Sequence, residues 1–134
     1  MKRKKKLTSG KRSRFEETVA KELEKHGWQY ENEKIIYTIP ESEHKYTPDF
    51  SKKETCIEIK GRFRTKAESD KYIHIRASNP RRRFIFIFQN PSVPMPGAKR
   101  RKDGTIFTMA DWAERNSFDY FTLSTLSELE SENN

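Results

Sequence analysis

The sequence has few cysteines and glycines and no long hydrophobic run. Its 134 residues contain one cysteine, Cys56, which excludes an internal disulfide and a cysteine-rich zinc site. The five glycines form no phosphate-binding loop or dinucleotide fingerprint. No apolar run approaches the roughly 20 residues that span a bilayer, and no apolar segment follows the basic N-terminus, so we expect neither a membrane partner nor a secretory signal. These absences favour a cytoplasmic location.

Positive charge is abundant and unevenly distributed. There are 28 Lys and Arg against 20 Asp and Glu, a net charge of +8, and residues 1–14 alone contain eight bases and no acid. We expect residues 1–12 to be a disordered basic tail and residues 13–134 to form one domain. A basic tail and a basic central region favour a nucleic acid partner. The alternatives at this point are a solubility tail with solvated charged faces, a localisation signal, or an anionic membrane surface.

Helix and strand patterns alternate along the rest of the chain. Ser13 with Glu16, and Thr65 with Glu68, are capping-box signatures that predict helix starts. The pattern predicts a mixed α/β fold, with a central mixed β-sheet flanked by helices. The expected elements are helices over 13–27 and 65–76, from Thr108, and over 124–131; strands over 28–30, 35–39, 46–50, 55–60, 83–88 and 118–121; a polar connector over 41–45; and an exposed loop over 90–104.

Three charged residues stand out against this pattern. Glu58 and Lys60 are two apart on an expected strand and therefore share a face, and Asp49 is expected on the neighbouring strand. Two carboxylates and an ammonium group are costly to bury without a function. Asp49 and Glu58 could share Mg²⁺, and Lys60 could orient or deprotonate a water that attacks a phosphodiester. The alternative is a solvated strand face with an ordinary cross-strand ion pair.

The first expected helix offers one further acid. At about 100° per residue, Glu16 falls within the apolar stripe of Phe15, Val19 and Leu23, whereas Glu17 points outward. Glu16 either serves only as the capping partner of Ser13 or faces the Asp49 and Glu58 pair as a third carboxylate.

With these residues, the chain resembles the phage endonuclease I family, the junction-resolving nucleases of short-tailed phages within the PD-(D/E)xK superfamily. The segment 37–50 carries the closest resemblance, followed at the right distance by Ile-Glu-Ile-Lys-Gly at 57–61. The helix over 15–27, the Tyr-Ile-His-Ile-Arg segment at 72–76 and the Phe-Ile strand also fit. The stretch over 90–103 diverges from the family.

The resemblance implies a PD-(D/E)xK core in a domain-swapped homodimer, with residues 40–46 as the bridge between subunits. It places Glu16, Asp49, Glu58 and Lys60 on the catalytic positions. One Mg²⁺ would be held by Asp49, Glu58 and the carbonyl of Ile59, and a second by Glu16 and Asp49, with Mn²⁺ as a substitute and no small-molecule cofactor. Each site would combine Glu16 of one chain with Asp49, Glu58 and Lys60 of its partner. The protein would act in the cytoplasm of a host cell.

The expected substrate is branched double-stranded DNA, cut at four-way (Holliday) and other junctions by metal-dependent phosphodiester hydrolysis. The alternatives are a sequence-specific homing or restriction nuclease of the same superfamily, and a non-catalytic basic DNA-binding module. The bases at 81–83 and 99–102 either extend the DNA surface or are simply solvated, and His44 is equally consistent with a structural role. The candidate DNA contacts are Lys4, Lys5, Lys11, Arg12, Arg14, His44, Arg62, Arg64, Lys66 and Arg76.

Overall fold

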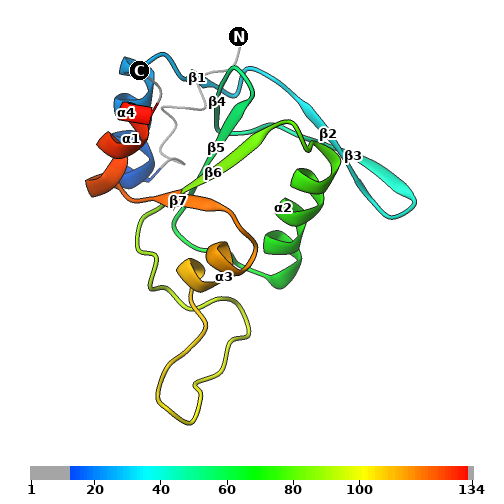
Figure 1. The fold of residues 1–134 in the computed structure, drawn as a ribbon, viewed down its shortest axis with the longest axis vertical. Helices are drawn as coiled ribbons and strands as arrows, with labels where there is room; N and C mark the ends of the chain where they lie inside the picture. The colour runs from blue at the N-terminus through cyan, green and yellow to red at the C-terminus, as the bar shows by residue number, and fades with distance from the viewer. Residues whose placement is uncertain (1–12, 133–134) are drawn as a thin grey trace.

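The computed structural model describes residues 13–132, which form a mixed five-stranded sheet with helices on both faces (Figure 1). The strand order is β1-β4-β5-β6-β7; β4 runs antiparallel to β1 and β5, and β6 runs parallel to β5 and β7. The predicted mixed α/β class is therefore confirmed. The strands of this sheet are β1 (Gln29–Tyr30), β4 (Phe50–Lys52), β5 (Thr55–Lys60), β6 (Arg83–Phe88) and β7 (Asp119–Phe121). The helices are α1 (Arg14–Lys25), α2 (Lys66–Ser78), α3 (Met109–Arg115) and α4 (Leu126–Glu132). The 3₁₀ turn η2 (Leu123–Thr125) precedes α4.

Alternation along β6 divides the core into two layers. Phe84, Phe86 and Phe88 lie on one face, where α2 and α3 cover them. Ile85 and Ile87 lie on the opposite face, which is covered by α1 and α4. All five side chains are buried, as expected for a strand with helices on both sides.

Helix starts follow the sequence signals, with one difference. Ser13 and Glu16 form the predicted reciprocal capping box at α1. At α2, the hydroxyl of Thr65 accepts from the N–H of Glu68 as predicted, but the Glu68 carboxylate bonds the N–H of Arg64 and the ammonium group of Lys60. The charged partner replaces the second half of the capping box, because charge-assisted hydrogen bonds are the stronger ones.

The expected polar connector over 41–45 is wrong. Residues Ser42–Tyr46 form a strand, β3, which pairs antiparallel with β2 (Ile35–Ile39) in a separate two-stranded hairpin. Glu41 makes the turn with a φ of 70°. Asn79, at the end of α2, donates its side-chain amide to the carbonyl of Ile36, which fixes the hairpin against α2. The role of residues 40–46 as a bridge between subunits stays a prediction.

The expected strand over 46–50 is also displaced. Strand β3 ends at Tyr46 and β4 begins at Phe50. Pro48 lies between them, and proline lacks the N–H that a ladder requires. Asp49 consequently precedes β4 instead of lying within it. None of the helices within residues 13–132 is both long enough and apolar enough to cross a membrane.

The Phe86 ring is the centre of an aromatic cluster on the α2 face. It is 1% exposed and contacts the rings of Phe63, Tyr72, Phe88, Trp112 and Phe118 at centroid distances of 5.1–5.8 Å. Trp112 and Phe118 are themselves buried in this core.

Truncating Phe86 should therefore be strongly destabilising. We expect Phe86→Ala to lower the free energy of unfolding by about 3–5 kcal/mol, the usual range for a buried phenylalanine. Leu123→Ala, at a side chain that is 42% exposed, should cost about 0.5 kcal/mol or less. Urea denaturation measures both, and equal losses would contradict the assigned core.

Candidate active site

Two carboxyl groups meet where β4 and β5 pair. Glu58 lies within β5, and Asp49 lies one residue before the Phe50 and Ile57 pair that begins the β4–β5 ladder. The Oδ2 atom of Asp49 accepts a hydrogen bond of 2.8 Å from the N–H of Ile59, and the two carboxyl groups are close enough for each to shift the pKa of the other. The predicted juxtaposition of Asp49 and Glu58 is confirmed.

Glu58 is surrounded by hydroxyl groups and one ammonium group. The Tyr46 hydroxyl donates to its Oε1 atom, and the Tyr72 hydroxyl on α2 lies near enough to lower the pKa of Glu58. The Nζ atom of Lys60 lies 3.9 Å from Oε2 of Glu58, and these two side chains are only 15% and 12% exposed. The alternative of a solvated strand face is therefore wrong.

The carboxyl groups have perturbed acidities because water is excluded from them. Burial, and then the neighbouring charge of Glu58, raise the pKa of Asp49 well above its usual range, against the opposing effects of the Ile59 N–H and Lys60. Burial also raises the pKa of Glu58, opposed by Lys60 and by the hydroxyls of Tyr46 and Tyr72. Two adjacent buried carboxyl groups cannot both ionise without additional positive charge.

This arrangement fits a divalent cation. Carboxylate oxygens are the ligands preferred by Mg²⁺, and the single ammonium group of Lys60 does not balance two carboxylates. Asp49 and Glu58 are the residues that could hold the ion. The main chain of Ile59, between Glu58 and Lys60, would supply the carbonyl that the family resemblance implies.

Lys60 has a second partner that sequence reasoning missed. Its Nζ atom lies 2.6 Å from Oε2 of Glu68, and Oε1 of Glu68 accepts a 2.7 Å hydrogen bond from the N–H of Arg64. Partial burial raises the pKa of Glu68, but the bonds from Arg64 and Lys60 outweigh this effect and lower the pKa overall. Glu68 therefore remains ionised and fixes the position of the Lys60 ammonium group. Its place at the start of α2 gave it the pattern of a capping residue, which concealed this contact.

Glu16 does not join these residues within one chain. Its Oε1 atom accepts from the N–H of Ser13 at 2.9 Å, so its capping role is confirmed. Within residues 13–132, one group of three His, Cys, Asp or Glu side chains brings its ligand atoms within 4.8 Å of one another. Glu16 is not part of that group. Its role as a metal ligand supplied to a second chain stays a prediction.

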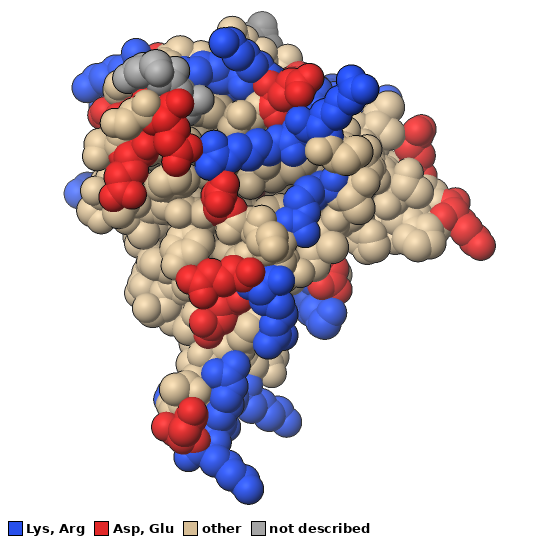
Figure 2. Space-filling model, viewed as in Figure 1, with Lys and Arg blue, Asp and Glu red and all other residues tan. Residues whose placement is uncertain are grey.

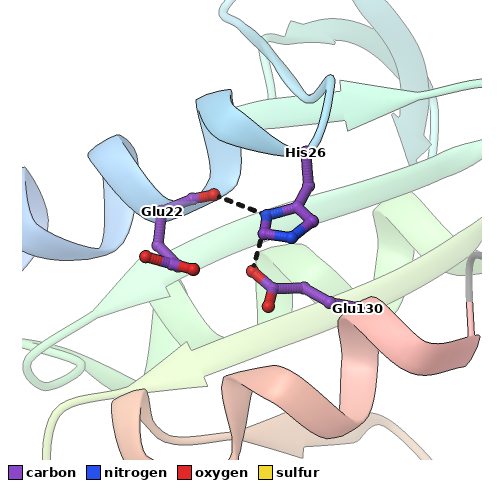
Figure 3. Close-up of side chains that lie close together, drawn as sticks. All are labelled: Glu22, His26 and Glu130. Carbon is purple, nitrogen blue, oxygen red and sulfur yellow. Dashed lines mark hydrogen bonds and ion pairs between the residues drawn. The ribbon is translucent and has the colours of Figure 1, made fainter.

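The group that does meet this distance criterion lies elsewhere. It comprises Glu22 of α1, His26 directly after α1, and Glu130 of α4 (Figure 3). The Nδ1 atom of His26 lies 3.1 Å from the Glu22 carbonyl oxygen and 3.0 Å from the Glu130 carboxylate. These contacts link the C-terminal end of α1 to α4.

The candidate DNA contacts differ in their surroundings. Arg62 and Arg64 follow β5 and are exposed, whereas the Arg76 guanidinium stacks on Phe118 at 4.2 Å and donates to a main-chain carbonyl. His44 stacks on Tyr37 with ring centroids 5.3 Å apart, which supports its structural role. DNA contact by these residues stays a prediction. Arg14 is exposed on α1, Lys66 pairs with Asp70 on α2, and Lys4, Lys5, Lys11 and Arg12 lie outside the described residues.

Cys56 shares the β5 face of Glu58 but is a core residue. Its side chain is buried, and burial raises the pKa of the thiol to about 11. A thiol with this pKa is almost entirely protonated near neutral pH and is a poor nucleophile.

The raised pKa of Asp49 has a consequence for stability. Its pKa in the folded state exceeds the unfolded value of about 3.9, so the protein loses stability as the pH rises from about 4 through the folded-state pKa. In EDTA, Asp49→Asn should therefore gain thermal stability over the parent protein as the pH rises from 4 to 8. Each kcal/mol corresponds to about 4 °C in Tm.

The control is Glu54→Gln, at an exposed position in the β4–β5 turn. Its Tm difference from the parent should not grow with pH. If the Asp49→Asn difference stayed constant or shrank over the same range, the perturbed acidity of Asp49 would be contradicted.

Sequence comparisons identify relatives of the chain. The profile of the phage endonuclease I family matches residues 1–125. The chain is 32% identical over 108 residues to endodeoxyribonuclease 1 of Enterobacteria phage T3, covering 78% of this chain and 66% of the relative. It is 38% identical over 85 residues to endonuclease I of Escherichia phage T7, covering 59% of this chain and 54% of the relative. The matches thus span only about two thirds and half of these relatives, but the profile covers nearly the whole chain, which therefore belongs to the phage endonuclease I family.

Proposed function

We propose that this chain is a divalent-metal-dependent DNA endonuclease that cuts four-way and other branched junctions as a homodimer in the cytoplasm of a phage-infected host cell. The observation that carries the proposal is the buried pair of Asp49 and Glu58 beside the ammonium group of Lys60. The names of the T3 and T7 relatives, endodeoxyribonuclease 1 and endonuclease I, support an activity of this class.

Asp49 and Glu58, with the Ile59 carbonyl, would hold Mg²⁺ or Mn²⁺. When bound there, the ion supplies Lewis-acid activation of water and neutralises charge that develops on the phosphodiester. The hydroxyls of Tyr46 and Tyr72 orient the Glu58 carboxylate, as outer partners of a metal ligand commonly do. The Ile59 N–H orients Asp49 in the same way.

Lys60 would act on the water or on the scissile phosphate. Its ammonium group is fixed between two carboxylates, at 2.6 Å from Glu68 and 3.9 Å from Glu58. A fixed ammonium group can donate a hydrogen bond to a non-bridging phosphate oxygen or to the attacking water without reorganisation at the moment of reaction. Glu68 is a positioning residue in this scheme.

A homodimer would complete the site and explain selectivity for branched DNA. Glu16 of one copy would reach Asp49 of the other, which would give each site its fourth catalytic residue and a second metal. Two such sites, held at a fixed separation, would select a DNA shape through its phosphates instead of its base sequence. Support for this arrangement comes from the family and from the separation of Glu16 from Asp49 and Glu58 within one chain.

The central test uses an immobile four-way junction and a linear duplex of matched sequence, each with Mg²⁺ or with EDTA. We expect cutting of the junction only with Mg²⁺, and a slowing of about 100-fold or more in Asp49→Asn and in Glu58→Gln. A metal site supplies several kcal/mol, and each 1.36 kcal/mol is tenfold in rate. Junction affinity should change by less than about threefold, because neither carboxylate contributes a cationic phosphate contact. Glu54→Gln is the matched control and should cut normally.

Each alternative outcome identifies a different protein. Cutting at one sequence in both substrates would indicate a sequence-specific nuclease. Tight binding without cutting in Mg²⁺ or Mn²⁺ would indicate a DNA-binding module. Activity within about tenfold of the parent in either acidic variant would contradict the metal site.

The positioning role of Glu68 gives a separate prediction. Glu68→Gln should lower kcat on the junction by about 10- to 100-fold, the range seen when outer partners of a site are lost, while KM stays nearly constant. Glu68→Asp should recover part of the rate because it keeps the charge. Asp70→Asn, on the same helix, removes only the exposed pair with Lys66 and should leave kcat unchanged. A rise in KM without a fall in kcat would instead make Glu68 part of the binding surface.

A further inference from the structure

Residues 95–107 form a projection from the body of the molecule, which we call the basic finger. It leaves the domain after β6, turns at its tip and returns to α3 (Figure 1). Strand β6 runs parallel to β5 and pairs with it up to Lys60 opposite Phe88. The chain that builds the finger therefore departs from the end of the sheet that carries Lys60.

The finger has a defined conformation. At its base, the N–H of Met95 donates to the carbonyl of Phe107 at 2.9 Å, and the N–H of Met109 donates to the carbonyl of Val93 at 2.9 Å. At its tip, the N–H of Arg101 donates to the carbonyl of Thr105 at 2.7 Å. These bonds hold the two sides of the projection together, and the buried side chain of Met95 anchors it in the core of the α2 face.

The tip carries a positive charge that is largely uncompensated. Lys99, Arg100, Arg101 and Lys102 are consecutive and exposed, and Figure 2 shows Lys and Arg side chains along this projection. Within the described residues, none of these four side chains forms an ion pair. Asp103, the one acid in the finger, instead accepts from the N–H and hydroxyl of Thr105.

Three other cationic side chains near α2 and β6 differ in this respect. Arg82 pairs with Glu33, Arg83 with Asp119 and Glu132, and Lys66 with Asp70. The charges of these three side chains are at least partly balanced by carboxylates. In the finger, Arg100 and Arg101 donate to neutral groups, the Gly104 carbonyl and the Thr105 hydroxyl, so their exposed charges are not balanced in this way. A folded, unbalanced cluster of this kind suits an external polyanion.

Cationic side chains continue from the active site to the finger. Arg62 and Arg64, which follow Lys60, line a hollow of about 430 Å³ with Pro94 and Pro96 at the finger base. A second hollow of about 620 Å³ shares Pro96 and is lined by the three cationic residues Lys66, Lys99 and Arg115. The two hollows thus connect the end of β5 to the finger.

We propose that the basic finger binds the phosphate backbone of a DNA arm several base pairs away from the scissile phosphate. This inference rests on the proposed function and adds a second contact region to the active site. The seven residues from Met95 to Arg101 are separated by six residue steps and can extend at most about 20 Å. At 3.4 Å per base pair, that reach corresponds to about six base pairs of duplex. Lysine and arginine at an exposed tip suit phosphate contacts, which position DNA without reading its sequence.

The test measures DNA affinity in the Asp49→Asn background, so that no cutting is required. The probe is the four-way junction, and the finger variant is Lys99→Gln with Lys102→Gln. Arg100 and Arg101 are kept because their side chains bond to Gly104 and Thr105 within the finger. Loss of two phosphate contacts should reduce the slope of log affinity against log salt by about 1.8. Between 50 and 200 mM salt, the parent should then lose about 12-fold more affinity than the variant.

Two controls define the contact. The first control, Lys21→Gln with Lys53→Gln, removes the same charge from exposed positions on α1 and in the β4–β5 turn. Lys53 lies at the opposite end of β5 from Lys60. This control should leave the salt slope almost unchanged. Junctions with arms of about four base pairs should bind the parent and the finger variant equally, because such arms end before the finger.

The outcomes separate the finger from the proposed function. If the finger variant keeps the parent salt slope while the parent still cuts junctions, the finger proposal is refuted and the nuclease stands. If the parent fails to cut but the finger variant still loses affinity, the finger binds DNA and the proposed function fails. Loss of binding to vesicles of anionic lipid, with DNA binding unchanged, would identify a membrane surface as the partner and refute the proposal.

Discussion

The structure depends on keeping two carboxyl groups of like charge side by side in a largely dry environment. Asp49 and Glu58 are adjacent, and burial raises the pKa of both carboxyl groups. The surrounding groups all act on this pair: tyrosine hydroxyls from β3 and α2 contact Glu58, a main-chain N–H contacts Asp49, and Lys60 supplies one positive charge. Such an arrangement is costly for a protein that needs only stability, because a well-packed apolar pair would serve the fold at least as well. A pair of adjacent carboxyl groups does suit a protein that attracts a cation to that position.

This constraint also explains the division of the sheet into two faces. The face with Ile57, Ile59, Ile85 and Ile87 is apolar and packs against α1 and α4. The opposite face carries Glu58 and Lys60 on β5, and the β6 phenylalanines pack beside them. The aromatic cluster excludes water from the polar residues and contributes two hydroxyl groups, those of Tyr46 and Tyr72, without placing a further charge in the core.

Much of this arrangement follows from local sequence patterns. The continuous apolar run from Phe84 to Phe88 predicts a strand buried on both faces. The two-residue spacing of Glu58 and Lys60 predicts their common face. The hairpin of β2 and β3 was not predictable in the same way. Its second strand is polar, and its turn uses Glu41 at positive φ where a glycine or asparagine would have been the usual signal. Glu68 was missed because a helix-capping position and an ion-pair position look alike until the tertiary structure brings Lys60 to it. The arrangement of two copies lies beyond what local patterns encode.

The packing of α4 against α1 has a consequence for the order in which the molecule is completed. Val19, Ala20 and Leu23 of α1 share a buried cluster with Leu126 and Leu129, more than a hundred positions later in the chain. During synthesis, the apolar side of α1 therefore cannot pack against α4 until almost all of the described chain has emerged. Contacts this distant in sequence form late and slow folding. Throughout that interval, an incompletely covered α1 can contact the same surface of a neighbouring nascent chain, which makes this the period of greatest risk of misassembly.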